Sequence, residues 1–433
     1  MHDAASPSPG LRARNGGRRG RVCMIVHAYY DEDPRVRREA EALVASGRPV
    51  DVIALRRPDD SAAAEVQGVT VRRLPVRRHQ GAGLATYLRE YLTFLVRAGA
   101  VLTAAHARRR YALVEVHSLP DFLVIAGLPL KILGVPLVLD LHEAMPEFFR
   151  SRFPKVTSRL AHRLVGLQER VSVRLADAVI TATQPFVNRL VGLGVPAEKI
   201  TLVHNSPDLA RFDPHAYPAR RFMEDGVLRL VYAGALTPTY ELDVVLDGVA
   251  LLRARRPDLP IELDVYGRGD DRDRLERHAE RLGLGGPVRF HDRVALEEVP
   301  ALIAASDVGL APTRRDRFTD MTLSTKVFEA AAMGKPVLAS GIRSVRSYFP
   351  EGTVAIYEPG SGEAFADVLA SLVDDPDGRA ARVARTADRI RELAWDGEAE
   401  RYVALIDRLT GNRIGSYGLL ARRKTLAATQ KEA

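Results

Sequence analysis

One stretch, Leu323–Ser340 (LSTKVFEAAAMGKPVLAS), constrains the fold more than any other part of the chain. The apolar run Ala330–Met333 predicts a packed helix, Gly334 predicts its end, and Pro336–Ala339 predicts a short buried strand. A buried strand directly after a helix is typical of the repeating unit of α/β domains. The stretch therefore favours an α/β fold with parallel strands.

The same helix carries two charged residues, Lys326 and Glu329, which are three positions apart and therefore share one face. Lys326 lies in the first turn, where the backbone N–H groups are unpaired and attract anions. Glu329 lies one turn deeper and could accept hydrogen bonds from a diol. This arrangement suits a phosphate and a ribose, although a surface helix followed by a core strand would show the same spacing.

Length and composition limit the choice of class. A chain of 433 residues predicts two or three domains, and 46% hydrophobic residues are typical of a globular protein. A single cysteine, Cys23, excludes an intramolecular disulfide and favours a reducing compartment such as the cytoplasm. Residues 1–20 predict a disordered basic arm, since they lack the apolar core of a signal peptide. The most apolar stretch, Phe122–Leu139, is interrupted by Lys131 and two prolines, and is too short to span a membrane.

The net charge of +8 is unevenly spread. Residues 1–215 contain 31 basic and 21 acidic residues, whereas residues 216–433 contain 32 basic and 34 acidic ones. The basic first half predicts an anionic partner, such as a lipid surface or a phosphorylated substrate. The chain has no nucleic-acid-binding module and no aromatic residues among its arginine clusters, so we expect no nucleic acid partner.

The order of elements predicts two α/β units. Arg21–His27, Arg35–Ser46 and Pro49–Leu55 form a strand–helix–strand opening, and a second unit begins at Leu228. No G-x-G-x-x-G follows the first strand, which argues against a dehydrogenase. The predicted parts are an N-terminal domain (21–207), a linker (208–226), a C-terminal domain (227–385), a crossing helix (386–412) and a tail (413–433).

Three positions at predicted strand ends are candidate site residues. Two buried strands end next to histidines, His117 and His142, and ligands of open α/β sheets bind at such carboxyl ends. We expect at least one of the two histidines in the site, and the sequence does not decide which. Gly234 ends another strand and would let the backbone approach a ligand. Arg268, in a GRGDD loop, is a candidate cation for a diphosphate.

The stretch around Lys326 resembles the nucleotide-sugar signature of glycosyltransferase family 4, in which K-x-x-E on a helix precedes A-x-G-x-P-V. The resemblance implies the GT-B fold, an α/β fold in which two Rossmann-like domains face a central cleft and a C-terminal helix crosses back to the first domain. In the family, the second glutamate of an E-x7-E motif holds the ribose hydroxyls, and it corresponds to Glu329. The first glutamate falls at Met321, so this chain departs from the full motif.

Further motifs extend the resemblance over residues 20–410 and place the chain near a subgroup with D-L-H-E and L-S-T-K-V-F-E. They are D-P-R-V-R-R-E from Asp33, V-H-S-x-P from Val116, D-L-H-E from Asp140 and a G-x-L-T-P loop at Gly234. The implied catalytic residues are His117, His142 and Lys326. The implied acceptor-side residues are Arg35, Glu143 and Asn205. The implied donor-binding residues are Gly234, Leu236, Arg268, Ser324, Thr325, Lys326 and Glu329.

The resemblance implies a retaining glycosyltransferase that moves a sugar from a nucleotide diphosphate sugar to a glycan, lipid-linked or small-molecule acceptor. No metal or other cofactor is expected, because D-x-D is absent at the strand ends and Lys326, Arg268 and helix N-termini would meet the phosphate charge. One alternative is a nucleotide-sugar epimerase, which the lack of paired carboxylates disfavours. The other is a binding subunit without turnover, which Met321 and the cation-poor loop Ala235–Tyr240 keep open.

A basic cluster, Arg72, Arg73, Arg77 and Arg78, precedes the predicted helix Leu84–Ala105. Six residues of this helix share one face: Leu84, Tyr87, Leu88, Tyr91, Leu92 and Leu95. The pattern favours packing of this face against the core. It also allows a second interpretation, in which the basic cluster and the helix bind reversibly to an anionic membrane from the cytoplasmic side.

Overall fold

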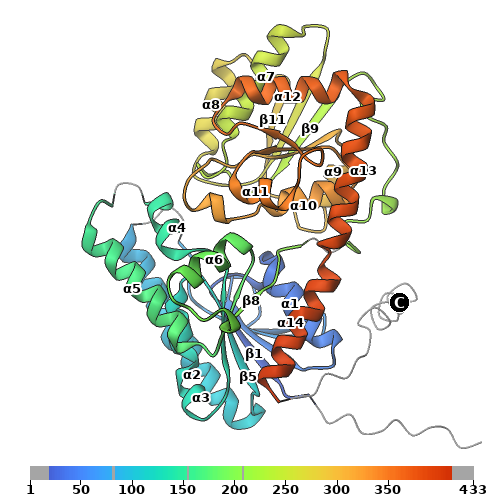
Figure 1. Ribbon diagram of the computed structural model, residues 1–433. Coiled ribbons are helices and arrows are strands. Elements are labelled where there is room, and N and C mark those ends of the chain that lie inside the picture. The colour runs from blue at the N-terminus through green and yellow to red at the C-terminus, as the bar shows by residue number, and fades with distance from the viewer. Residues whose placement is uncertain (1–18, 80–82, 154–155, 207–208, 412–433) are drawn as a thin grey trace, which may run out of the picture.

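The computed structural model describes residues 19–79, 83–153, 156–206 and 209–411, which fold into two α/β domains, one above the other in Figure 1. Almost all of the basic arm predicted for residues 1–20, and the whole tail predicted for 413–433, lie outside the described residues. Within the described ranges, no helix combines the length and the apolar character that crossing a bilayer requires.

The first domain is built on an eight-stranded sheet in the order β3-β4-β2-β1-β5-β6-β7-β8. All neighbours are parallel except β3 and β4. The strands are β1 (Val22–Val26), β2 (Val50–Leu55), β3 (Ala63–Val66), β4 (Val69–Leu74), β5 (Leu113–His117), β6 (Leu137–Leu141), β7 (Ala178–Thr181) and β8 (Ile200–Leu202). The parallel strands β1, β2, β5, β6 and β7 are buried throughout, as expected where helices cover both faces.

The antiparallel strand β3 is the element of this sheet that sequence reasoning missed. It pairs with β4 through a two-residue turn, in which Gln67 and Gly68 have φ angles of 50° and 77°. Positive φ at both positions is the geometry of a type I′ hairpin turn, which favours glycine at the second of them. Alternating exposure along β3 marks it as an edge strand.

Two helical layers cover the first sheet. One core layer lies under α2 (Leu84–Arg109), α5 (Arg159–Leu175) and the 3-10 helix Asp121–Gly127, and the other lies under α1 (Pro34–Ala45) and the C-terminal helix α14 (Trp395–Leu409). The helices of the domain are α1 (Pro34–Ala45), α2 (Leu84–Arg109), α3 (Leu128–Ile132), α4 (Met145–Arg152), α5 (Arg159–Leu175) and α6 (Gln184–Gly192).

The second domain has a six-stranded, fully parallel sheet in the order β11-β10-β9-β12-β13-β14. Its strands are β9 (Leu228–Ala233), β10 (Ile261–Tyr266), β11 (Val288–His291), β12 (Val308–Ala311), β13 (Val337–Ser340) and β14 (Ala355–Tyr357). Its helices are α7 (Leu242–Arg255), α8 (Arg272–Arg281), α9 (Val299–Ala304), α10 (Thr325–Ala332), α11 (Arg343–Tyr348), α12 (Gly362–Asp374) and α13 (Pro376–Glu392).

The chain then returns to the first domain. Helix α13 packs on α10, whereas α14 (Trp395–Leu409) packs on α1, so the crossing point lies between them (Figure 1). Trp395 and Tyr402 join the first domain's core beside β1. The buried Arg48 donates from Nε to Asp407 Oδ1 of α14 at 3.2 Å. Two Rossmann-like domains and a C-terminal helix that crosses back are the predicted architecture, which the structure confirms.

Candidate active site

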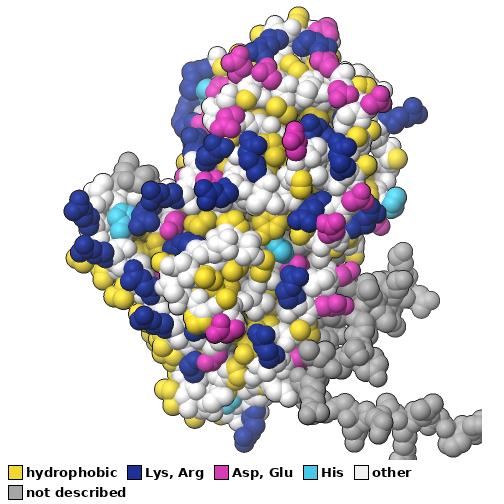
Figure 2. Space-filling view, in the orientation of Figure 1, with side chains coloured by type: hydrophobic (Ala, Val, Ile, Leu, Met, Phe, Trp, Pro, Cys, Tyr) yellow, Lys and Arg dark blue, Asp and Glu magenta, His cyan; other side chains and the backbone are white. Residues whose placement is uncertain are grey.

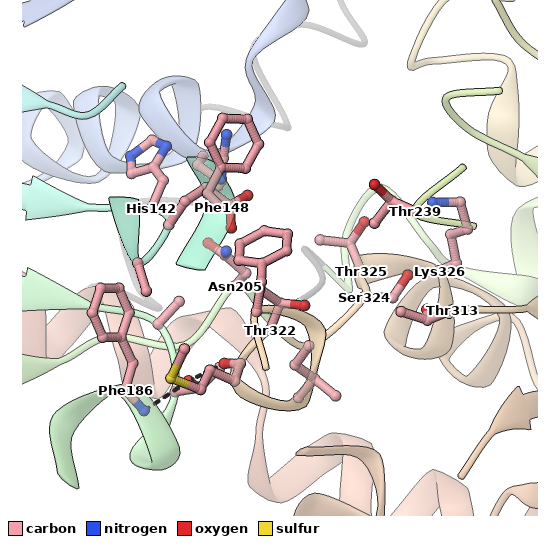
Figure 3. A pocket seen from close by; sticks show the side chains of 18 of the residues that line it. His142, Phe148, Phe186, Asn205, Thr239, Thr313, Thr322, Ser324, Thr325 and Lys326 are labelled. Atoms are coloured by element: carbon pink, nitrogen blue, oxygen red, sulfur yellow. Dashed lines mark hydrogen bonds between the residues drawn. The ribbon is translucent and has the colours of Figure 1, made fainter. Parts of the chain in front are cut away.

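A cavity of about 400 Å³ lies between the two domains, at the carboxyl ends of strands from both sheets (Figure 3). Ligands of open α/β sheets bind at such strand ends. Its first-domain wall includes Pro34, Arg35, His142, Glu143, Ala144, Phe148, Thr183, Phe186 and Asn205. Its second-domain wall includes Ala235, Thr237, Thr239, Tyr240, Thr313, Phe318, Met321, Ser324, Thr325 and Lys326.

The second-domain wall is formed largely by the start of α10. Ser324 precedes the helix, and its side chain caps no backbone N–H. The hydroxyl groups of Ser324 and Thr313 are buried and have no hydrogen-bond partner within the described part of the chain. Free hydroxyls and free N–H groups at a helix N-terminus can together bind phosphate oxygens.

Lys326 supplies the positive charge of this wall. Its Nζ lies 4.0 Å from the ring centroid of Tyr240 and 5.1 Å from that of Tyr232, so two aromatic faces stabilise the ammonium group. No described carboxylate forms an ion pair with it. A β-carbon at Gly234 would lie 2.2 Å from Lys326 Cε, so glycine makes room for the lysine. The charge is therefore held in place and remains available to an anion.

The first-domain wall contains His142, which is hydrogen-bonded to a buried carboxylate behind it. His142 Nε2 lies 2.6 Å from Asp140 Oδ2, and His117 Nδ1 lies 3.0 Å from the same oxygen. His117 is fully buried and does not line the cavity, whereas His142 does. Of the two candidate histidines, His142 is therefore the one at the cleft, and His117 supports it from behind.

The electrostatics of this cluster shift the pKa values of the two histidines in opposite directions. Burial and the nearby Arg35 lower the pKa of His142. Burial opposes protonation of His117 as well, but its hydrogen bond to Asp140 and the charge of Glu115 raise its pKa above the ordinary value. Neutral His142 then donates from Nε2 to Asp140, which leaves its Nδ1, without a partner among the described residues, as an acceptor.

A second polar pair on this wall is Arg35 and Glu143, both of which line the cavity. Arg35 Nε lies 3.3 Å from Asp33 Oδ1, and this carboxylate helps to raise the pKa of the guanidinium despite its burial. Burial raises the pKa of Glu143 to about 7, with Arg35 acting in the opposite direction. Glu143 Oε2 has no hydrogen-bond partner within the described ranges, so this carboxyl group can bind a ligand hydroxyl.

The raised pKa of Glu143 predicts a pH-dependent stability. Between its ordinary pKa of 4.5 and about 7, the unfolded chain releases the Glu143 proton while the folded protein retains it, so rising pH favours unfolding. The free energy of unfolding of the wild type should therefore fall by about 2–3 kcal/mol relative to Glu143→Gln across this window. Urea titrations at about pH 5 and about pH 8 measure this difference. Parallel curves for the two proteins would show that Glu143 titrates normally.

The structure brings together Arg35, His142, Glu143, Asn205, Ser324, Thr325 and Lys326 of the predicted site residues. The other five lie outside the cavity lining: His117, as described above, and four residues of the second domain. Arg268 is largely exposed and lies 3.7 Å from Asp292, while Leu236 is fully buried in the second domain's core. Glu329 is half-buried one turn into α10 and is not among the lining residues, and Gly234 lies against Lys326. Burial raises the pKa of Glu329, and Lys326 and Thr325 partly offset the shift.

Sequence reasoning missed the hydroxyl-rich part of the second-domain wall. Thr237, Thr239 and Tyr240 line the cavity from the loop after β9. This loop carries no lysine or arginine, so a search for cations does not find it. Its three hydroxyl groups are the sequence signal that could have indicated a ligand-binding loop. Arg314, which follows β12, donates from Nε to the carbonyl of Pro238 at 3.0 Å and holds this loop.

The buried cluster behind His142 also contains atoms spaced closely enough to hold a metal ion, in the sets His117–Asp140–His142 and Glu39–Glu115–His117. The first set includes His142 of the cleft wall and is already joined by hydrogen bonds, whereas none of the three residues of the second set lines the cavity. The absence of a metal requirement stays a prediction.

Comparison with known families gives two matches that together cover most of the chain. Residues 33–206 match the family described as "Glycosyl transferase 4-like domain", and residues 228–375 match the family "Glycosyl transferases group 1". The boundary between the two matches coincides with the linker before β9.

Curated relatives are glycosyltransferases. A D-inositol 3-phosphate glycosyltransferase of Streptomyces scabiei is 29% identical over 303 residues, which is 66% of this chain and 66% of that protein. The enzyme of the same name from Streptomyces avermitilis is 30% identical over 61% of this chain and 59% of its own length. The one from Kribbella flavida is 27% identical over 78% of this chain and 81% of its own length. The chain thus spans less than two thirds of the length of the first two of these relatives.

Solved structures share the whole fold. Sucrose-phosphate synthase from Thermosynechococcus elongatus superposes with a TM-score of 0.73 at 19% identity, covering 91% of this chain and all of that one. HepE of Anabaena, solved in complex with UDP-glucose, gives a TM-score of 0.67 at 16% identity over 90% of this chain and 100% of its own. The two family matches, the relatives and the shared two-domain architecture agree, and the chain belongs to glycosyltransferase family 4, with the GT-B fold.

Proposed function

We propose that the protein is a retaining glycosyltransferase that moves a sugar from a nucleoside diphosphate sugar to an acceptor. The observation that carries the proposal is the placement of Lys326. This lysine stands at the N-terminus of α10, forms no ion pair with a described carboxylate, and lies on the wall opposite His142 (Figure 3). A diphosphate at the start of α10 would extend its sugar toward the first domain. The UDP-glucose bound to HepE of Anabaena supports this choice of donor, and the names of the relatives support transfer of a sugar.

The proposed chemistry needs a stabilised leaving group more than a strong base. The bond from the sugar's anomeric carbon to the phosphate oxygen breaks, and a bond from the same carbon to the acceptor oxygen forms on the same face. The proton of the acceptor hydroxyl passes to the leaving phosphate oxygen. Lys326 and the N–H groups of α10 stabilise the negative charge that develops there. Neutral His142 accepts a hydrogen bond from a sugar hydroxyl through Nδ1.

The acceptor would bind at the first-domain wall, where Arg35, Glu143 and Asn205 offer one cation, one carboxyl group and one amide. A glycan, a lipid-linked sugar and a small molecule all carry hydroxyl groups that such a wall can bind. Since lipid-linked acceptors lie at a bilayer, the proposal includes reversible binding of the protein to the cytoplasmic face of an anionic membrane.

Incubation of the pure protein with a panel of nucleotide sugars tests the proposal. Release of nucleotide that depends on an added acceptor, with retained anomeric configuration in the product, supports it. Conversion of the donor sugar without acceptor would indicate the epimerase, and binding without turnover would indicate the binding subunit. Addition of a chelator should leave turnover unchanged, because positive charge from the protein meets the phosphates.

Glu329 gives a prediction for donor binding. Its carboxylate is proposed to accept hydrogen bonds from the ribose diol, so Glu329→Ala should weaken nucleotide binding by about 1.5–3 kcal/mol while the protein stays folded. Calorimetry with the nucleotide measures the change, and Glu329→Gln, which keeps one acceptor, should lose less. An unchanged dissociation constant in the folded alanine variant would exclude this role.

A further inference from the structure

The first domain exposes an apolar face along α2 and α5, which we call the α2–α5 face. On α5, four residues at helical spacing form a stripe and are 40–66% exposed: Leu160, Leu164, Leu167 and Val171. On α2, three more are 46–69% exposed: Leu88, Leu92 and Val96. Both helices pack on the 3-10 helix Asp121–Gly127, whose Ile125 is 42% exposed between them. Exposed apolar side chains in contiguous rows mark an interaction surface.

All exposed charges on these two helices are positive. The only acidic residue in α2 is Glu90 and the only one in α5 is Glu169; both are buried, where they contact His27 and Arg189, respectively. The exposed arginines of the two helices are Arg89, Arg97, Arg108, Arg159, Arg163, Arg170 and Arg174. None of them forms an ion pair with a described acidic residue. Figure 2 shows hydrophobic and basic side chains next to each other along this outer edge of the first domain.

This surface differs from the one expected from the sequence. The assignment of Leu88 and Leu92 to the core-facing side of the helix was wrong, because both are exposed. Of the predicted basic cluster, Arg73 is engaged inside the domain, with Nη2 lying 3.3 Å from Asp31. Arg77 and Arg78 remain exposed. The sequence shows α5 as an amphipathic helix, but not that its apolar stripe faces solvent.

We propose that the α2–α5 face docks the protein on an anionic lipid bilayer. Leucine and valine side chains would enter the interface between headgroups and acyl chains, and the arginines beside them would contact lipid phosphates. The charge pattern distinguishes this partner from a second copy of the chain. A two-fold dimer through this face would place the same arginine-rich rows against each other, without exposed carboxylates on either helix to compensate.

The position of the face suits an acceptor that is held in the membrane. Helix α5 runs along the outer edge of the first domain, close to α4 (Figure 1). Arg152 at the end of α4 lies 2.6 Å from Asp270 of the second domain, so this end of the face lies beside the junction of the domains. Docking itself does not rest on the proposed transfer reaction, whereas delivery of a lipid-linked acceptor does.

Vesicle co-sedimentation of the full chain tests the docking. We expect binding to phosphatidylcholine vesicles that contain about 30 mol% phosphatidylglycerol, weakening as salt rises, and little binding to pure phosphatidylcholine. Arg163→Gln/Arg170→Gln/Arg174→Gln should lower the affinity for anionic vesicles at least tenfold, since each arginine contributes about 1 kcal/mol and about 1.4 kcal/mol is tenfold. Leu164→Gln/Leu167→Gln should lower this affinity as well, because glutamine side chains cannot enter the apolar part of the bilayer as leucine does.

A matched control is Leu251→Gln/Arg277→Gln, which removes an exposed leucine and an exposed arginine from the second domain. It should bind vesicles like the wild type, and all variants should share its unfolding temperature. Equal binding to neutral and anionic vesicles, or no binding to either, would overturn the proposal. A wild-type dimer in solution that the Leu164→Gln/Leu167→Gln variant dissociates would also overturn it, since the face would then be a subunit interface. Loss of docking with unchanged turnover on a water-soluble acceptor would leave the transferase proposal intact.

Discussion

Replacing Lys326 by methionine is expected to lower turnover by about a hundredfold or more, with the fold unchanged. The reason is that Nζ is held near the rings of Tyr240 and Tyr232 at the start of α10 and forms no ion pair with a described carboxylate. A preorganised charge of this kind acts mainly on the negative charge that develops on the leaving diphosphate, so turnover should fall more than donor affinity. Steady-state kinetics with a nucleotide sugar and an acceptor measure both quantities.

Arg268→Met is the matched control for this experiment. Its side chain is 70% exposed and does not line the cavity, so we expect turnover within a few-fold of the wild type. If Lys326→Met retained turnover within a few-fold while Arg268→Met abolished it, the diphosphate would bind closer to β10 than proposed. Turnover unaffected in both variants would assign the leaving-group charge to another cation.

The largest expected effect on stability is that of Asp407→Ala, which should lower the free energy of unfolding by about 3–5 kcal/mol. The side chains of Arg48 and Asp407 are 0% and 3% exposed, and Arg48 also donates to the carbonyl of Gly20 and the hydroxyl of Thr410. Removal of the carboxylate leaves a buried guanidinium without its counter-charge. Chemical denaturation, followed by circular dichroism, measures the loss.

Asp388→Ala provides the comparison, because Asp388 forms an ion pair with Arg391 in which both side chains are 68% exposed. An exposed pair contributes little, so this variant should stay within about 1 kcal/mol of the wild type. The double variant Arg48→Met/Asp407→Leu should be more stable than Asp407→Ala alone, since no buried charge remains unpaired. Equal losses for Asp407→Ala and Asp388→Ala would mean that α14 is not anchored through this contact.

The part of the site that could be predicted from sequence is the part formed by consecutive residues. Ser324, Thr325 and Lys326 lie together because they begin one helix, and the helix start is visible in the sequence as an amphipathic run before Gly334. The two-domain fold could be predicted for a similar reason, since alternating strands and helices restrict the sheet to a parallel arrangement.

Residues whose role depends on the path of a loop could not be predicted in the same way. Leu236 and Arg268 lie in the loops that follow β9 and β10, and the backbone N–H of Leu236 donates to the carbonyl of Arg268 at 3.0 Å. This contact pairs the two loops while Leu236 turns into the core and Arg268 turns to solvent. The sequence likewise could not show which of His117 and His142 lines the cavity, because the two differ only in which of them packs one layer behind the other.

The return of the chain to the first domain has a consequence for the order in which the protein folds during synthesis. An N-terminal domain usually completes folding while the rest of the chain is still being made. Here the layer beneath α1 lacks Trp395, Tyr402 and Ile406 until α14 has left the ribosome, after the whole second domain. The nascent first domain therefore exposes one incomplete apolar layer throughout elongation. The second domain, although synthesised later, has its sheet and covering helices complete before the first domain does.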